Sequence, residues 1–149
     1  LYTEDFALVS PPDHPIAGRT DVQVAELRDL DLLLLDDGHC LRDQIVDLCR
    51  HAHVNPAEAT NSVTRASSLT TIMQLVMGGL GCTLIPKSAL ATECHGKNLG
   101  IAYFDPDVTA EREIGLVFRS SAARSEEFRE FGTLITAAYE NALARSLEH

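Results

Sequence analysis

The chain has 149 residues, of which 45% are hydrophobic and 23% are charged, the composition of an ordinary globular domain. Twelve Lys and Arg against 22 Asp and Glu give a net charge of −10, so we expect phosphate backbones to repel this chain and any DNA contact to belong to another part of the protein. No apolar run approaches the roughly 18 residues of a membrane span, and the start lacks the pattern of a signal peptide. We therefore expect no membrane contact and a cytoplasmic location.

The two ends suggest a fragment. The chain begins without methionine, and residues 147–149 resemble the junction of an expression tag. Four cysteines are too few for a disulfide scaffold. In a reducing compartment such cysteines are expected to be buried, metal-binding or redox-active.

Short apolar runs predict strands, and helical spacing of apolar residues predicts helices between them. The expected strands lie at residues 6–9, 32–35, 63–66, 82–85, 101–104 and 114–118. Expected helices run from a cap at Thr20 or Asp21 through Leu27, from about 41 to 52, from a cap at Ser67 or Ser68 to about 80, and from Ser125 to about 142. Asn55-Pro56 should end the second of these helices. The alternation of strands and helices indicates an α/β fold.

The last helix has acidic residues in its first turn, where they favour helix formation. Its apolar residues keep a helical period, which predicts one buried face made of Phe128, Phe131, Ile135, Ala138 and Ala142.

The stretch around Cys40 carries the strongest chemical signal. Gly38 supplies a turn after the strand at 32–35, and apolar residues then recur at the helical positions Leu41, Ile45 and Leu48. Cys40 therefore lies where a strand ends and a helix begins. Unpaired N–H groups at such a place favour a thiolate, the reactive form of a thiol.

Cys49 follows nine positions later in the same expected helix. Two side chains so spaced lie roughly 13 Å apart along the helix axis and point to opposite faces. A disulfide needs Cα atoms within about 7 Å, so the pair can be joined only if the helix unwinds. If the pair is redox-active, oxidation must change the fold locally. The alternative is that both are small buried hydrophobes, as free cysteines often are.

A metal site is a rival hypothesis, because Cys49, His51 and His53 lie close in sequence, with His39 and Cys40 upstream. Zinc ligands usually show Cys-x-x-Cys or helical spacing, whereas spacing by two scatters side chains around a helix. We therefore expect no metal. The remaining cysteines, Cys82 and Cys94, match no motif.

Residues 38–44, Gly-His-Cys-Leu-Arg-Asp-Gln, followed by Cys49, resemble the redox switch of the OxyR group of LysR-type transcriptional regulators, which sense hydrogen peroxide. Further segments also fit the regulatory half of that family, namely 1–6, 13–15, 65–69, 79–81, 84–86 and 112–117. The resemblance covers almost the whole chain. The switch motif is specific, and the later segments are generic to LysR-type effector domains.

This resemblance implies a LysR effector-binding domain with the two-lobed, type 2 periplasmic-binding-protein-like fold. The second lobe would span residues 11–111 and carry the switch. The first lobe would be represented by residues 1–10 and by a return strand and C-terminal helix at 112–146. Its other elements, and the N-terminal helix-turn-helix of the family, would be absent from this chain.

The resemblance also implies roles for four residues and requires no cofactor. Cys40 would attack peroxide and become a sulfenic acid, and Cys49 would resolve it to a disulfide. Arg112 would approach the reactive sulfur, and His39 would donate a hydrogen bond or shuttle a proton.

Each of the supporting residues also has a simpler interpretation. Arg112 could be a surface arginine paired with Glu111 or Glu113, and His39 could satisfy backbone groups of the turn. Asp43 and Gln44 are expected to order the loop rather than to react.

The implied function is regulation of antioxidant genes. The intact protein would bind promoter DNA through its absent N-terminal domain as a homo-oligomer, a dimer or tetramer, with RNA polymerase as a further partner. Glutaredoxin or thioredoxin would reduce it. Two alternatives stay open: a regulator that binds an organic ligand near Ser67 and Ser68, and a thiol-peroxidase-like enzyme, although we expect no enzyme.

Overall fold

The structure, a computed structural model, describes residues 1–54, 65–121 and 123–147. Asn55-Pro56, the first two residues of the expected strand at 63–66, and the last two residues of the expected tag junction lie outside these ranges. The helices and strands follow in the order β1 Tyr2–Ser10, η1 Val24–Asp29, β2 Leu34–Leu35, α1 Cys40–His51, β3 Arg65–Ala66, α3 Leu69–Met77, β4 Thr83–Pro86, η2 Lys87–Ala89, α4 Leu90–Glu93, β5 Gly100–Tyr103, β6 Glu111–Ile114 and α5 Ser125–Leu147.

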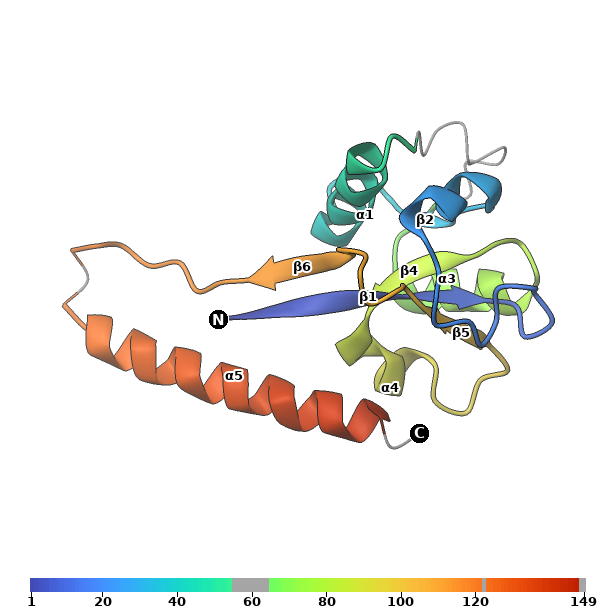
Figure 1. The fold of residues 1–149 in the computed structure, drawn as a ribbon. Coiled ribbons are helices and arrows are strands. Elements are labelled where there is room, and N and C mark those ends of the chain that lie inside the picture. Colours follow the sequence, from blue (N-terminus) through green and yellow to red (C-terminus); the bar gives the residue numbers. More distant parts are fainter. Residues whose placement is uncertain (55–64, 122, 148–149) are drawn as a thin grey trace.

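The long strand β1 organises the sheet (Figure 1). Its C-terminal half lies between β4 and β5, with Phe6 opposite Pro86 and Ala7 opposite Tyr103, both antiparallel. Its N-terminal half pairs antiparallel with β6. Because successive side chains of a strand point to opposite faces, β1 contributes to the packing on both sides of the sheet.

Helices cover both faces of this sheet. On one face Leu8 belongs to a hydrophobic cluster with Leu27 of η1 and with Ile45 and Cys49 of α1. On the other face lies a cluster that joins the β1 residues Ala7 and Val9 to residues of α3 and α4, among them Ile72, Met73, Val76 and Leu90. The predicted α/β fold is thus confirmed, with β1 in the middle layer.

Two short strands, β2 and β3, run parallel and each leads into a helix, β2 into α1 and β3 into α3. The chain before β2 is also tied to the start of β4, because Leu32 forms a parallel bridge with Cys82, whose N–H donates to Asp31 at 2.8 Å. Gly81 permits this approach, since a Cβ atom there would lie 2.3 Å from the Asp31 carbonyl oxygen.

Several predicted boundaries shift in the structure. Only residues 34–35 of the run at 32–35 form a strand, although all four are buried. The short helix after Thr20 is a 3-10 helix capped by Gln23 and Glu26 in a capping box, while Asp21 accepts from Arg19. The expected cap at Ser68 is confirmed.

The predicted ends of two later elements are wrong. Helix α3 ends at Met77, so Leu80 lies beyond it and is exposed. The last strand is β6, Glu111–Ile114, and the apolar run at 115–118 is not in a strand. Val117 within that run is 96% exposed.

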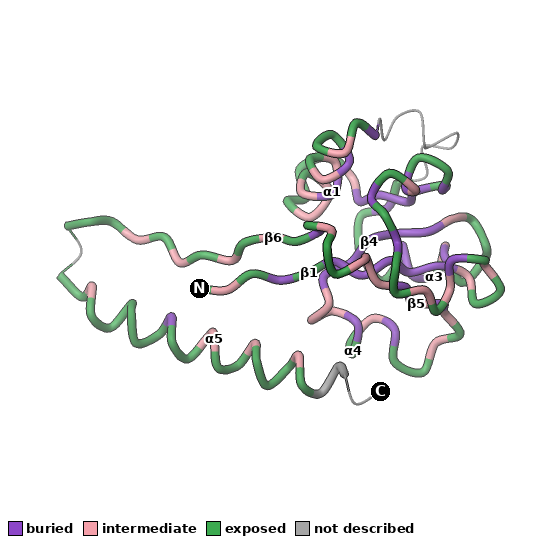
Figure 2. Tube along the Cα trace, viewed as in Figure 1, coloured by how far each residue is buried: buried purple, intermediate pink, exposed green. Residues whose placement is uncertain are grey.

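The arm from β6 to α5, residues 111–121 and 123–147, differs from the rest of the molecule. Figure 2 shows mostly exposed residues along α5, in contrast to the buried segments around β1. The helix contacts β1 through Tyr139, whose ring stacks on Tyr2 with centroids 3.8 Å apart. Gly132 is buried, and a Cβ atom there would lie 2.9 Å from a methyl group of Leu1.

The predicted buried face of this last helix is therefore wrong. Of its five expected members, Phe128, Phe131, Ala138 and Ala142 are exposed and Ile135 is half-buried. The less exposed side of α5 instead includes Gly132, next to Leu1, together with Ile135 and Tyr139, which are half-buried.

Candidate functional site

Helix α1 begins at Cys40, as the sequence predicts. The preceding turn is fixed by backbone hydrogen bonds, because the N–H of Asp36 donates to Ala66 of β3 at 3.0 Å and the N–H of His39 donates to Asp36. Gly38 takes a positive φ of 93°, which glycine adopts without strain. The turn places the Cys40 side chain at the exposed first position of the helix.

Cys49 lies in the last turn of the same helix and is 0% exposed. Both cysteines are free. Nine helical positions separate them by roughly 13 Å along the axis, well beyond the reach of a disulfide. The structure therefore has the geometry of a reduced pair, and a bond between the two requires α1 to unwind.

Burial distinguishes Cys40 from the other thiols. Burial raises the pKa of Cys49 to about 11 and has the same effect on Cys82 and Cys94. These three thiols are therefore protonated near neutral pH, and all three residues are buried. Cys40 alone among the four cysteines is exposed.

His39 is the N-cap residue of α1, and its exposed ring makes no capping hydrogen bond. The simpler interpretation, that its side chain satisfies the backbone of the turn, is not seen at this helix start. Its backbone carbonyl accepts from the N–H of Asp43 at 3.3 Å.

Two neighbours in the first turns of α1 have distinct surroundings. Arg42 forms an ion pair with Asp37 at 2.9 Å, and Asp37 also accepts from Arg65 of β3 at 2.8 Å. Gln44 lies one turn after Cys40, and its buried Oε1 atom has no hydrogen-bond partner in the described part of the chain. Asp37, which the sequence analysis did not single out, thus connects α1 to β3.

Arg112 lies in β6 directly opposite Glu4 of β1. Its Nε and Nη2 atoms donate to Glu4 at 2.9 and 2.7 Å, so its partner is neither Glu111 nor Glu113. The chain that leads into β6 adds Ala110, with Val108 packed against it, to the hydrophobic cluster that also contains Ile45 of α1.

The family of the chain follows from comparison with known proteins. A family model described as the LysR substrate binding domain matches residues 1–140. The chain belongs to the LysR substrate-binding domain family.

Among curated members, a probable hydrogen peroxide-inducible genes activator of Mycobacterium avium is 53% identical over 135 residues, which cover 91% of this chain and 42% of that protein. The DNA-binding transcriptional dual regulator OxyR of Escherichia coli K12 is 38% identical over 139 residues, 92% of this chain and 43% of that protein. The chain thus spans less than half the length of these curated relatives. The resemblance to the OxyR group is confirmed.

Solved structures also show the resemblance to the OxyR group. A Corynebacterium glutamicum OxyR mutant with hydrogen peroxide bound is 56% identical, with a TM-score of 0.94 over 99% of this chain and 46% of that one. The oxidized form of OxyR from that organism is 57% identical over 99% of this chain and 45% of that one, yet its TM-score is 0.81. At nearly equal identity, this chain is therefore less similar to the oxidized form. The two free cysteines on an intact α1 agree with that ranking.

Within the LysR fold, the residues of the metal hypothesis do not form a site. Cys49 is buried, whereas His51 and His53 are exposed and the His51 ring contacts the backbone oxygen of Asp47 at 2.7 Å. Across the described ranges, no three His, Cys, Asp or Glu residues are grouped so as to hold a metal ion. In the same ranges, no helix has the length and apolar character needed to cross a membrane.

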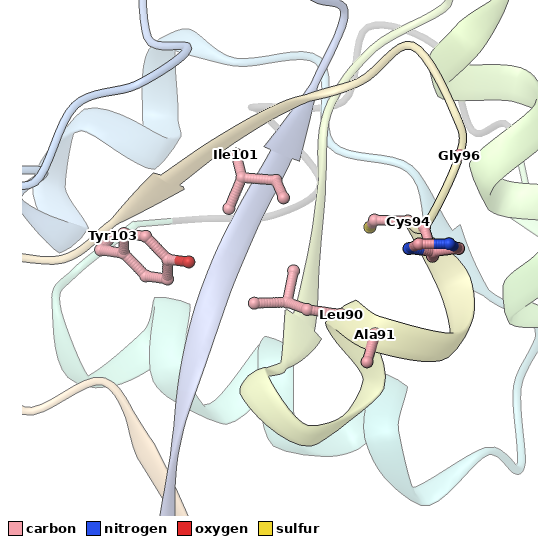
Figure 3. A pocket seen from close by; sticks show the side chains of 7 residues that line it. Leu90, Ala91, Cys94, Gly96, Ile101 and Tyr103 are labelled. Atoms are coloured by element: carbon pink, nitrogen blue, oxygen red, sulfur yellow. The ribbon is translucent and has the colours of Figure 1, made fainter. Parts of the chain in front are cut away.

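The ligand-binding alternative for LysR domains rested on Ser67 and Ser68. Ser68 caps α3 by accepting from the N–H of Thr71 at 3.2 Å, as predicted. A cavity of about 380 Å³ lies elsewhere, between α4 and β5 (Figure 3). Leu90, Cys94 and Tyr103 line it, and neither serine does.

Glu4 is the residue of this region that the sequence analysis missed. Its side chain is buried and holds Arg112, although the two residues are far apart in sequence. The sequence did contain a signal that Glu4 is buried. Glu4 and Phe6 are two positions apart, so they share one face of β1, and that face is buried.

Proposed function

We propose that this chain is the peroxide-sensing regulatory domain of a LysR-type transcriptional regulator. The observation that carries the proposal is the contrast on α1. Cys40 is exposed at the first helical position, and Cys49 is buried at the other end of the same helix. The names of the relatives, which include hydrogen peroxide-inducible activators, support it further.

In the proposed reaction the Cys40 thiolate attacks one oxygen of hydrogen peroxide. An S–O bond forms, the O–O bond breaks, the sulfur is oxidised to a sulfenic acid, and the second oxygen leaves as hydroxide and takes up a proton to become water. The Cys49 thiol then attacks the Cys40 sulfur. The S–O bond breaks, a second water leaves, and a disulfide remains. The second step follows unwinding of α1, which also exposes the buried Cys49.

Two further residues would assist the first step. Arg112 would stabilise the negative charge that develops on the leaving oxygen, as a charge-assisted donor. His39, whose ring is exposed beside Cys40, would donate a hydrogen bond or carry the proton to that oxygen.

The same proposal covers the intact protein. Residues 11–111 would form the second lobe, and residues 1–10 and 112–146 would belong to the first. DNA would be bound by a part outside this acidic chain, in a cytoplasmic homo-oligomer, and thioredoxin or glutaredoxin would restore the thiols. The protein would act as a regulator and not as an enzyme, so turnover of peroxide with a reductant should be slow.

Peptide mapping with intact-mass measurement tests the proposal on reduced chain titrated with hydrogen peroxide. We expect the wild type to lose two hydrogen atoms and to link the Cys40 and Cys49 peptides. Cys49→Ala, chosen because this side chain is buried, should instead trap one oxygen on Cys40. Cys40→Ser should do neither.

Cys82→Ala and Cys94→Ala are matched controls, because both remove a buried thiol outside α1. They should leave the Cys40–Cys49 link unchanged. If Cys40 stays reduced at oxidant levels that modify an unstructured thiol, the redox proposal fails, and ligand binding becomes the better hypothesis.

A further inference from the structure

The carboxylate of Glu4 is the most deeply buried charged group in the described structure, with a residue exposure of 1%. Its two oxygens have separate partners. Oε2 accepts from Nε and Nη2 of Arg112, and Oε1 accepts from the backbone N–H of Ser88 at 2.9 Å. A carboxylate held at both oxygens by two different elements cannot rotate.

A buried charge needs such partners, because an unpaired carboxylate away from water is strongly unfavourable. The arrangement therefore fixes Arg112 as well as Glu4. Two of the three guanidinium nitrogens of Arg112 are engaged by Glu4. The third, Nη1, has no acceptor within residues 1–54, 65–121 and 123–147, so it is the nitrogen left for another oxygen.

The neighbouring ion pair on β1 differs in this respect. Asp5 accepts from Lys87 at 2.6 Å, and the carboxylate of Asp5 is exposed. Asp5 and Lys87 make no contact with Arg112 among the described interactions. The two adjacent carboxylates of β1 thus serve different cations, and only Glu4 is connected to β6 through a side chain.

We infer that Glu4 is a positioning residue for the reaction of Cys40 with peroxide. It anchors Arg112 through Nε and Nη2, so that Nη1 stays in place to donate to the oxygen that leaves when the O–O bond breaks. This inference rests on the proposed role of Arg112. Fixing a donor before the reaction lowers the cost of reorganisation in the transition state, which is why its anchor affects the rate.

A double-mutant cycle tests the inference. Rate constants for sulfenic acid formation would be measured by stopped flow with hydrogen peroxide in the Cys49→Ala background, where the reaction ends at that product. Glu4→Gln can satisfy either Arg112 or Ser88 but not both as an acceptor. We expect it to slow the reaction at least about 10-fold, as a misplaced catalytic group does.

The decisive comparison is with Arg112→Ala. Once Arg112 is absent, Glu4→Gln should change the rate by less than about twofold, because a residue that acts only through another has no effect without it. Alkylation of Cys40 by iodoacetamide, which needs no donor to a leaving oxygen, should change by less than about twofold in Glu4→Gln. Asp5→Asn is the matched control and should leave both rates unchanged.

The outcomes separate the two proposals. If Arg112→Ala leaves the peroxide rate unchanged, the proposed role of Arg112 fails. If Arg112→Ala slows the reaction but Glu4→Gln does not, the positioning role of Glu4 fails alone. Equal slowing by Glu4→Gln with and without Arg112 would also overturn it.

Folding is checked by thermal denaturation of each variant. If Glu4→Gln does not fold, Glu4→Asp keeps the charge but withdraws the carboxylate by one methylene group, and a few-fold slower peroxide reaction is expected. If neither variant folds, Glu4 is a folding residue and the positioning role is rejected.

Discussion

The two neighbouring strand–helix units, β2–α1 and β3–α3, have the same local plan but different anchoring. Both strands are two residues long, run parallel and lead directly to a helix. Helix α3 starts at Leu69, is capped by the Ser68 side chain, and buries Ile72, Met73 and Val76 among its nine residues. Helix α1 starts at Cys40, after the N-cap residue His39, which gives no side-chain cap, and it buries only Ile45 and Cys49 among twelve residues.

This difference matters for the proposed function. In the proposed function, α1 must unwind so that the cysteines at its two ends can join, and its first turn should therefore be held weakly. Helix α3 does not unwind and should keep the lobe folded. An unused cap position and a short buried stripe leave α1 with fewer stabilising interactions than α3 has. The comparison can be tested by perturbing each unit in the same way.

The largest effect is expected from oxidation. Forming the Cys40–Cys49 disulfide should accelerate amide hydrogen exchange in α1 at least about 100-fold and leave α3 within about threefold, because only α1 must lose its backbone hydrogen bonds. Hydrogen exchange with mass spectrometry measures both helices in one sample. Peroxide-treated Cys49→Ala is the control, and retained protection of α1 in the bridged protein would contradict the prediction.

A second, smaller effect concerns pH. Burial raises the pKa of Cys49 and Cys82 from the usual 9.0 of a thiol to about 11. Because the folded state favours the protonated thiol, this contribution to stability is complete below about pH 9 and is lost as pH rises through about 11, at roughly 2 kcal/mol for each thiol at pH 11.

Cys49→Ala and Cys82→Ala should therefore reduce the alkaline loss of unfolding free energy by equal amounts, as measured by urea denaturation between pH 8 and pH 11. Comparing variants removes the contribution of other groups that titrate in this range. A much smaller reduction for Cys49→Ala would mean that α1 already opens enough for solvent to reach this thiol.

The two N-caps give a third comparison. Ser68→Ala should lower the unfolding free energy by about 1 kcal/mol, because it removes the acceptor of the Thr71 N–H. His39→Ala should change it by less than about 0.5 kcal/mol, since the His39 ring caps nothing. Urea denaturation near pH 7 measures both. A loss at His39 as large as that at Ser68 would show that the ring stabilises α1.

A further small effect is expected at Asp37, which pairs with Arg42 of α1 and Arg65 of β3. The carboxylate is exposed, so Asp37→Asn should cost less than about 1 kcal/mol, and the loss should shrink at high salt. Denaturation at two ionic strengths measures this. A loss that does not depend on salt would argue against an electrostatic connection between the two units.

The local features of the two units could be predicted from sequence. The start of α1 at Cys40 follows from Gly38 and the apolar spacing after it, and the start of α3 follows from Ser68. These signals lie within a few residues of the element that they define, so no knowledge of the remaining chain is needed.

The long-range features could not be predicted in this way. Strand β6 lies at 111–114 because it pairs with the N-terminal half of β1, where Arg112 meets Glu4, and not where its apolar residues are densest. Residues Gly132 and Tyr139 of α5 likewise pack against Leu1 and Tyr2. Both arrangements depend on residues more than 100 positions away, which no local periodicity reports.

The placement of both cysteines on one helix has an electrochemical consequence. The free energy that holds α1 folded must be given up when the disulfide forms, so it favours the dithiol and raises the reduction potential of the pair. For a two-electron couple, about 1.4 kcal/mol of helix stability corresponds to about 30 mV. In the proposed sensor, the weakly capped α1 would therefore set how readily cellular thiols return the protein to its resting state.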